Sequence, residues 1–105
     1  MANFNDLINK SDIPVLVDFH ADWCQPCHIL APIIKEVAND FADDLKVLKV
    51  NIDKNKKAAI KFQIKSIPTL ILFYKGKILW RSSGVMKKNQ LISQLTPHIK
   101  NKAKA

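Results

Sequence analysis

Short blocks of apolar residues, separated by polar ones, predict four β-strands. Residues 13–20 are mostly apolar on both faces, which is typical of a central strand covered on two sides. Residues 45–53 alternate between the two faces, as expected of a second strand. Residues 70–74 and 77–81 flank a Lys-Gly pair, and this arrangement predicts an antiparallel hairpin.

Apolar residues at helical spacing predict four helices around these strands. The expected helices cover residues 4–10, 24–41, 54–62 and 88–96, and Pro97 is expected to shorten or bend the last one. The long second helix connects two strands, and this connection calls for a right-handed crossover between parallel strands. The pattern therefore predicts an α/β fold, in which about four helices flank a central mixed sheet.

The composition is that of one globular domain covering residues 1–105, with 48% hydrophobic and 25% charged residues. Lysines are spread along the chain and give a net charge of +8, and residues 100–105 are expected to form a flexible basic tail. Residues 1–10 lack the apolar core of a signal peptide, and no run is long enough to span a membrane. We therefore expect a cytoplasmic protein, in a compartment that keeps thiols reduced.

The two cysteines of the chain, Cys24 and Cys27, lie in the hexapeptide Trp-Cys-Gln-Pro-Cys-His. Residues three apart on a helix are neighbours, so these thiols can close into a disulfide. If the helix begins at Cys24, its N–H groups and dipole favour a thiolate and lower the pKa of Cys24 below about 8.5. Cys24 is then the expected nucleophile, and Cys27, one turn further along, the resolving thiol. Pro26 suits the first turn of this helix.

Three other interpretations of the hexapeptide compete with a redox dithiol. A structural disulfide would close a very small ring in a chain without an export signal. A zinc site would need two more ligands, and His20, His28 and His98 lack finger spacing. The sequence Cys-x-x-Cys-His also matches the attachment motif of c-type haem, for which Met86 or His98 could be a second axial ligand. The strand-like runs before and after the hexapeptide instead favour a βαβ sheet. We therefore favour the redox dithiol, with no metal and no cofactor besides this disulfide, and expect His20 and His28 to modulate it.

Two residues near the cysteines are expected to assist the chemistry. Asp18 lies in the first strand, where burial should raise its pKa, and it can then accept the proton of Cys27 directly or through a water. The alternative is a bend in the strand that exposes Asp18. Trp23 is expected at the rim of the site, covering Cys24 and contacting the substrate, and the alternative is a tryptophan in the core.

Six motifs occur in an order that resembles the thioredoxin family of the Trp-Cys-x-Pro-Cys type, over about residues 4–99. They are Val17-Asp18-Phe19, Ala21 to Cys27 (with Trp23, Gln25 and Pro26), Ala31-Pro32, Val50 to Asp53, Ile67-Pro68-Thr69 and Gly84. The resemblance implies the thioredoxin fold and a cis peptide bond before Pro68. It also implies a thiol–disulfide oxidoreductase that reduces protein disulfides through a mixed disulfide on Cys24, and so serves cell redox homeostasis.

The resemblance implies further site residues. Lys49, on the neighbouring strand, is expected to temper the pKa of Asp18, although a lysine at a strand edge can also simply point to solvent. Ile67 is expected to offer backbone hydrogen bonds to an extended substrate segment, and Gly84 to let that segment approach closely. The implied substrate groove consists of Trp23, Ile67, Pro68, Gly84 and Val85.

Three departures from the family pattern qualify these expectations. Thioredoxins usually begin with an additional strand, for which this chain has no residues, so we expect four strands. Gln25 replaces the glycine that is common there, which leaves the reduction potential and partner range open. The chain is also strongly basic, which makes acidic proteins expected substrates.

The expected partners follow from this resemblance. They are thioredoxin reductase as electron donor and proteins with disulfides as substrates, for a monomer without nucleic-acid or membrane partners. A redox-inactive or nucleic-acid-binding module is the alternative. The lysines weigh against it, because they are dispersed and not interleaved with exposed aromatic residues.

Overall fold

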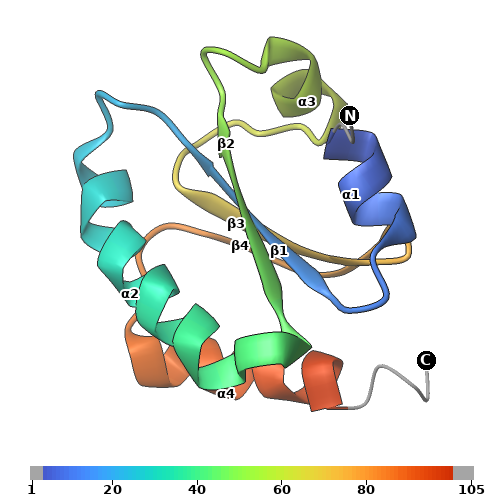
Figure 1. The fold of residues 1–105 in the computed structure, drawn as a ribbon. Helices are drawn as coiled ribbons and strands as arrows, with labels where there is room; N and C mark the ends of the chain where they lie inside the picture. The colour runs from blue at the N-terminus through green and yellow to red at the C-terminus, as the bar shows by residue number, and fades with distance from the viewer. Residues whose placement is uncertain (1–3, 101–105) are drawn as a thin grey trace.

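The computed structural model describes residues 4–100, and its four strands form one mixed sheet in the order β2-β1-β3-β4 (Figure 1). Strand β1 runs parallel to β2 and antiparallel to β3, and β3 runs antiparallel to β4. The strands are β1 (Val15–His20), β2 (Lys46–Asn51), β3 (Thr69–Tyr74) and β4 (Lys77–Ser83).

Helices cover both faces of the sheet, α2 and α4 on one and α1 and α3 on the other (Figure 1). They are α1 (Phe4–Lys10), α2 (Gln25–Phe41), α3 (Lys56–Lys61) and α4 (Lys88–Lys100). Across the described residues, the α/β class, the four-stranded mixed sheet and its four flanking helices are therefore as the sequence predicted. A short 3₁₀ helix, η1 (Ala42–Asp44), was not predicted.

Each layer of helices buries its own hydrophobic core against the sheet. The core under α2 and α4 is mostly aliphatic, and it includes Leu16, Leu30, Ile34, Leu72, Leu91 and Leu95. The core under α1 and α3 is partly aromatic, because the rings of Phe4, Phe19, Phe62 and Phe73 contact one another. Each fully buried side chain of this size stabilises the fold by about 1.5–3 kcal/mol, so both cores hold the sheet rigidly under the site.

Most boundaries differ from the sequence prediction by one or two residues, and the new ends of α4 and β4 have a clear physical reason. Helix α4 continues through Pro97 to Lys100, since Leu95 and Ile99 on either side of the proline are both buried in the core. Strand β4 extends to Ser83, because Ser83 pairs with Thr69 at the start of β3. Residues 101–105 of the expected basic tail lie outside the described part of the chain.

The topology brings four connecting segments to one end of the sheet. Strands β1 and β2 end there, because they are parallel, and β3 begins there, because it is antiparallel to β1. Strand β4 also ends there, with Ser83 opposite Thr69. The loops after β1, after β2, before β3 and after β4 are therefore neighbours, and they carry the residues of the candidate site.

Candidate active site

The two cysteines lie at the start of α2, joined by a disulfide bond with their Cα atoms 5.3 Å apart. Cys24 is the N-cap residue, and its Sγ accepts a hydrogen bond of 3.2 Å from the backbone N–H of Cys27. Gln25 and Pro26 occupy the first turn, where a missing N–H leaves no partner unsatisfied. The dithiol can therefore form and break a disulfide without displacing the helix.

The disulfide lies on an apolar floor made by Ala21, Ile52 and Ile67. Cys24 is 3% exposed and Cys27 is 6% exposed, so burial does not distinguish the two sulfurs. Their positions distinguish the two sulfurs, because Cys24 caps the helix and its sulfur accepts a hydrogen bond from a backbone N–H that would otherwise lack a partner. The two sulfurs therefore differ in position and in hydrogen bonding, although they are similarly buried.

Trp23 lies at the rim of the site and is 70% exposed. Its indole Nε1–H donates a 2.8 Å hydrogen bond to Oδ2 of Asp53, in the loop after β2. A flat apolar ring held in this way can cover a substrate chain without losing much side-chain entropy. The structure thus places Trp23 beside the cysteines and outside the core.

A network of polar side chains ties the loop of the cysteines to the loop after β2. Asn51 donates to Oδ1 of Asp22 at 3.3 Å, and its own Oδ1 accepts the backbone N–H of Asp53 at 2.9 Å. The ring of His28 pairs with the backbone oxygen of Asp22 at 2.7 Å. This positioning role of Asn51 was not predicted, although an Asn-x-Asp sequence at the end of a strand is a typical turn signal.

A shallow groove of about 290 Å³ borders the disulfide and is lined by Trp23, Ile52, Ile64, Lys65, Ser66 and Ile67. The Ile67-Pro68 peptide bond is cis, and Pro68 is buried. The carbonyl oxygen of Pro68 accepts the N–H of Gly84 at 2.9 Å, which holds the segment after β4 next to the groove.

Gly84 and Val85 present an open surface beside this groove. Gly84 has a positive φ of 91°, and a Cβ built on it would meet no other atom within 4 Å in the described structure. Glycine is therefore favoured here by backbone conformation, and the space in front of it is free for an approaching chain. The side chain of Val85 is exposed.

Asp18 is 2% exposed, and its Oδ1 has no hydrogen-bond partner within residues 4–100. Asp18 is two residues after Leu16, and alternate residues of a strand point to the same face, so Asp18 points to the face of β1 that α2 covers. Burial raises the pKa of Asp18 above its ordinary value, and the positive charges of His20 and Lys49 partly oppose this rise. Lys49 is the register partner of Asp18 on β2. The strand therefore holds a carboxyl group that binds a proton more tightly than usual.

Arg81 is a positioning residue that the sequence analysis missed. Its guanidinium donates to the backbone oxygens of Phe62 and Gln63, the second at 2.8 Å. These two residues directly follow α3, and Gln63 has a positive φ of 53°. The fork of Arg81 thus fixes the start of the segment that leads to Ile67. This role is visible only in the contact between Arg81 on β4 and the residues after α3, since an arginine on an edge strand has no distinctive sequence signal.

No group of three or more His, Cys, Asp and Glu side chains within residues 4–100 is placed to hold a metal ion. No helix in the same part of the chain is long and apolar enough to cross a membrane.

Comparison with known proteins decides the family. A model of the Thioredoxin family matches residues 1–97. The chain belongs to the thioredoxin family. It is 45% identical to Thioredoxin 1 of Chlorobaculum tepidum over 83% of this chain and 86% of that protein. It is 45% identical to a thioredoxin of Rickettsia bellii over 92% of each chain.

This thioredoxin-family protein is also 42% identical to the chloroplastic Thioredoxin Y of Oryza sativa, over 90% of this chain and 56% of that protein. Its family and its cysteine pair at disulfide distance identify it as a thiol–disulfide oxidoreductase of the protein-disulfide reductase type.

Proposed function

We propose that the chain reduces disulfides of other proteins with Cys24 as the nucleophile and Cys27 as the resolving thiol. The observation that carries this assignment is the N-cap position of Cys24, whose sulfur accepts the N–H of Cys27. An anionic sulfur at this position is stabilised by the N–H groups and the dipole of α2.

The reaction has two exchange steps. The Cys24 thiolate attacks one sulfur of the substrate disulfide, so that a Cys24–substrate disulfide forms and the other substrate sulfur leaves as a thiolate. Cys27 then loses its proton and attacks Cys24 Sγ, which forms the Cys24–Cys27 disulfide and releases the second substrate sulfur. Two electrons pass from the protein to the substrate, and both substrate thiolates take up protons.

Asp18 is the proposed acceptor of the Cys27 proton. It lies on the face of β1 covered by α2, the helix whose first turn carries Cys27. Its raised pKa suits this role, because a base with a pKa nearer neutrality exchanges protons more readily at cellular pH. Lys49 tunes this pKa through its charge on the neighbouring strand.

An extended segment of the substrate is proposed to lie in the groove beside the disulfide. Trp23 and Ile67 supply apolar contacts, and the backbone at Ile67 and Pro68 is proposed to form hydrogen bonds with the substrate. Gly84 and Val85 leave space for the approaching chain. Backbone hydrogen bonds of this kind bind many sequences, which suits a reductase with several substrates.

The proposed partners are a thioredoxin reductase, which returns two electrons to the disulfide, and proteins with disulfides, acidic ones among them. The net charge of +8 favours encounters with acidic proteins. We propose a monomer in the cytoplasm without nucleic-acid or membrane partners. Two relatives, Thioredoxin Y of Oryza sativa and Thioredoxin Y2 of Arabidopsis thaliana, are named as chloroplastic, so an organelle is the alternative location.

Reduction of insulin by the dithiol form tests the proposal. We expect turnover with dithiothreitol as electron donor, no turnover for Cys24→Ser, and trapped mixed disulfides for Cys27→Ser. Cys24 should also react with iodoacetamide near neutral pH well before Cys27, because only its thiolate is stabilised. Absence of insulin reduction, together with retention of nucleic acid at physiological salt, would instead support the nucleic-acid-binding module.

A further inference from the structure

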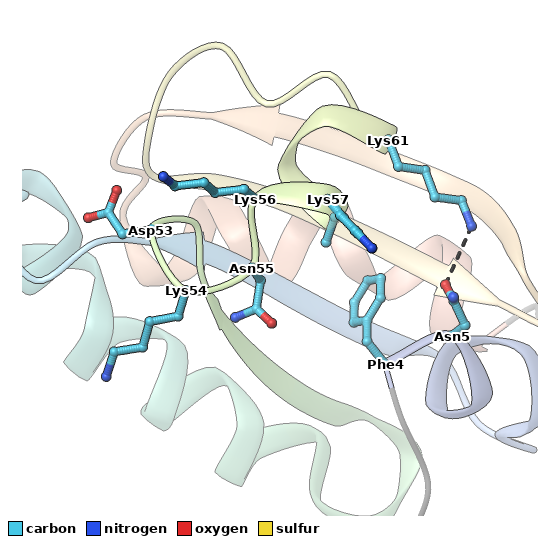
Figure 2. A pocket seen from close by; sticks show the side chains of 9 residues that line it. Phe4, Asn5, Asp53, Lys54, Asn55, Lys56, Lys57 and Lys61 are labelled. Carbon is cyan, nitrogen blue, oxygen red and sulfur yellow. Dashed lines mark hydrogen bonds between the residues drawn. The ribbon is translucent and has the colours of Figure 1, made fainter.

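A basic pocket lies between the start of α1 and α3, and we call it the α3 pocket (Figure 2). It has a volume of about 610 Å³, and its walls carry Lys54, Lys56, Lys57 and Lys61. In Figure 2 the Phe4 ring lies between the loop after β2 and α1, with Lys57 above it. Four lysines thus line the pocket, with the amines of Lys57 and Lys61 on the side of the Phe4 ring and those of Lys54 and Lys56 turned away from it.

Within residues 4–100, the lysines of the α3 pocket outnumber its carboxylates and are not paired with them. None of the four lysines forms an ion pair with another described residue. Among the described residues, the Lys61 amine interacts with two neutral groups, the Asn5 Oδ1 at 3.4 Å and the Phe62 ring. Asp53 is the one carboxylate among the described residues that line the pocket, and its Oδ2 accepts the indole N–H of Trp23.

The same lysines are unfavourable for α3. Lys57 and Lys61 are four residues apart, a spacing at which like charges repel on a helix. Lys56 and Lys57 lie in the first turn, which contains no acidic residue, although the helix dipole disfavours cations there. An anionic partner would relieve both effects.

An exposed apolar residue stands among these charges. Ile60 is 76% exposed and follows Lys56 by one helical turn. Ile60 does not line the pocket, so a free phosphate ion bound there would gain nothing from this side chain, whereas a longer peptide segment with both acidic and apolar residues can extend past the pocket to Ile60.

We propose that the α3 pocket binds an acidic segment of the protein whose disulfide this chain reduces, an inference that rests on the proposed function. The hydrogen bond from Trp23 to Asp53 makes the wall of the pocket continuous with the rim of the redox site. A partner that covers Trp23 to reach Cys24 therefore also reaches α3. The pocket then speeds the association of acidic partners and leaves the exchange chemistry unchanged.

The test compares two peptides that share one disulfide loop, one flanked by four glutamates and the other by four glutamines. Stopped-flow measurement gives the second-order rate constant for the reduction of each peptide by the dithiol form. We expect wild type to reduce the glutamate peptide about 10-fold faster at low salt, with a preference that shrinks as salt is added. The glutamine peptide reports the redox chemistry alone.

Two charge-reversal variants separate the pocket from the overall charge. Lys56→Glu/Lys57→Glu should lose the preference for the glutamate peptide and reduce the glutamine peptide as wild type does. Its fold is not at risk, since acidic residues suit the first turn of α3. Lys46→Glu/Lys77→Glu is the matched control, because both lysines are exposed at the strand ends remote from the redox site. It should keep most of the preference.

Equal rates for both peptides, or equal losses in the two variants, would overturn the α3 pocket as a docking site and leave the proposed function standing. Failure of wild type to reduce either peptide would overturn the proposed function and this inference with it. A short single-stranded oligonucleotide gives the third arm. Tight binding that Lys56→Glu/Lys57→Glu abolishes, with no preference for the glutamate peptide, would show a nucleic-acid site in its place.

Discussion

Asp18 is a carboxylic acid at a position where water cannot solvate its charge. It is buried in β1, one of its oxygens lacks a hydrogen-bond partner among the described residues, and burial raises its pKa. An unsatisfied buried polar atom costs about 1–3 kcal/mol of stability, more if it is charged. The residue is therefore a burden on the fold, and its retention is explained if Cys27 needs a proton acceptor.

The effect of pH on stability follows from the direction of this pKa shift. The folded protein holds the Asp18 proton more tightly than the unfolded chain, whose carboxyl group has a pKa of about 3.9. The unfolded state therefore loses its proton first as pH rises. Asp18 thus lowers the free energy of unfolding progressively from about pH 4 up to its folded pKa, and the full penalty remains at higher pH.

Asp18→Asn should stabilise the protein at pH 8 by about 1 kcal/mol or more, because the amide keeps the shape and removes the charge. The gain should be much smaller at about pH 3, below both pKa values, where the carboxyl group is largely protonated in both states. The variant should nonetheless reduce disulfides more slowly, because Cys27 has lost its proton acceptor. Urea unfolding at both pH values and turnover on insulin measure these effects.

Asp43→Asn is the matched control for this prediction, because Asp43 is exposed in η1, and it should change neither property. If Asp18→Asn destabilises the protein at pH 8 and turns over as fast as wild type, Asp18 has no catalytic role.

At the scale of elements, the sequence predicts what depends on local pattern and misses what depends on distant contacts. The start of α2 was predictable, because Pro26 follows the N-cap and the apolar spacing begins there. The passage of α4 through Pro97 was not, since it depends on the burial of Ile99 against other elements.

The same distinction holds for the candidate site. The cysteines and Asp18 stand out in the sequence because thiols and a buried carboxylate are chemically unusual. The hydrogen bonds of Asn51 and Arg81 depend on which loops the sheet brings together, and no local signal encodes that proximity.

Arg81→Lys tests whether the end of α3 is fixed from β4. A lysine keeps the charge but cannot reach two backbone oxygens with a planar fork, so the segment that leads to Ile67 should become less ordered. We expect a stability loss of about 1 kcal/mol. We also expect a raised KM for a peptide disulfide, with the alkylation rate of Cys24 unchanged.

Arg81→Gln removes both the charge and the planar fork, whereas Arg81→Lys removes the fork and keeps the charge. Comparing the two variants therefore separates the effect of the hydrogen bonds from that of the charge. If Arg81→Lys behaves like wild type and only Arg81→Gln raises KM, the charge of Arg81 matters and its two hydrogen bonds do not.

At the scale of the whole molecule, the sheet leaves β2 at an edge. Within residues 4–100, β2 pairs only with β1, so one side of its backbone has no strand partner. Exposed edges invite pairing between molecules, and lysines on the edge strand are a common protection against it. Lys46 and Lys49 are both exposed on β2. The lysines on β2 thus have a second role, because their charge opposes the pairing of this edge with another molecule.

Lys46→Thr/Lys49→Thr should therefore promote self-association. Threonine favours strands and removes the like charges that two β2 edges would bring together, so pairing between molecules should become favourable. Sedimentation velocity from micromolar to near-millimolar concentration should show a monomer for wild type and a concentration-dependent dimer for the variant. Lys57→Gln/Lys61→Gln removes the same charge from α3, away from the edge, and should stay monomeric. If both variants associate equally, the overall charge protects the protein, and if neither does, the edge of β2 needs no protection from its lysines.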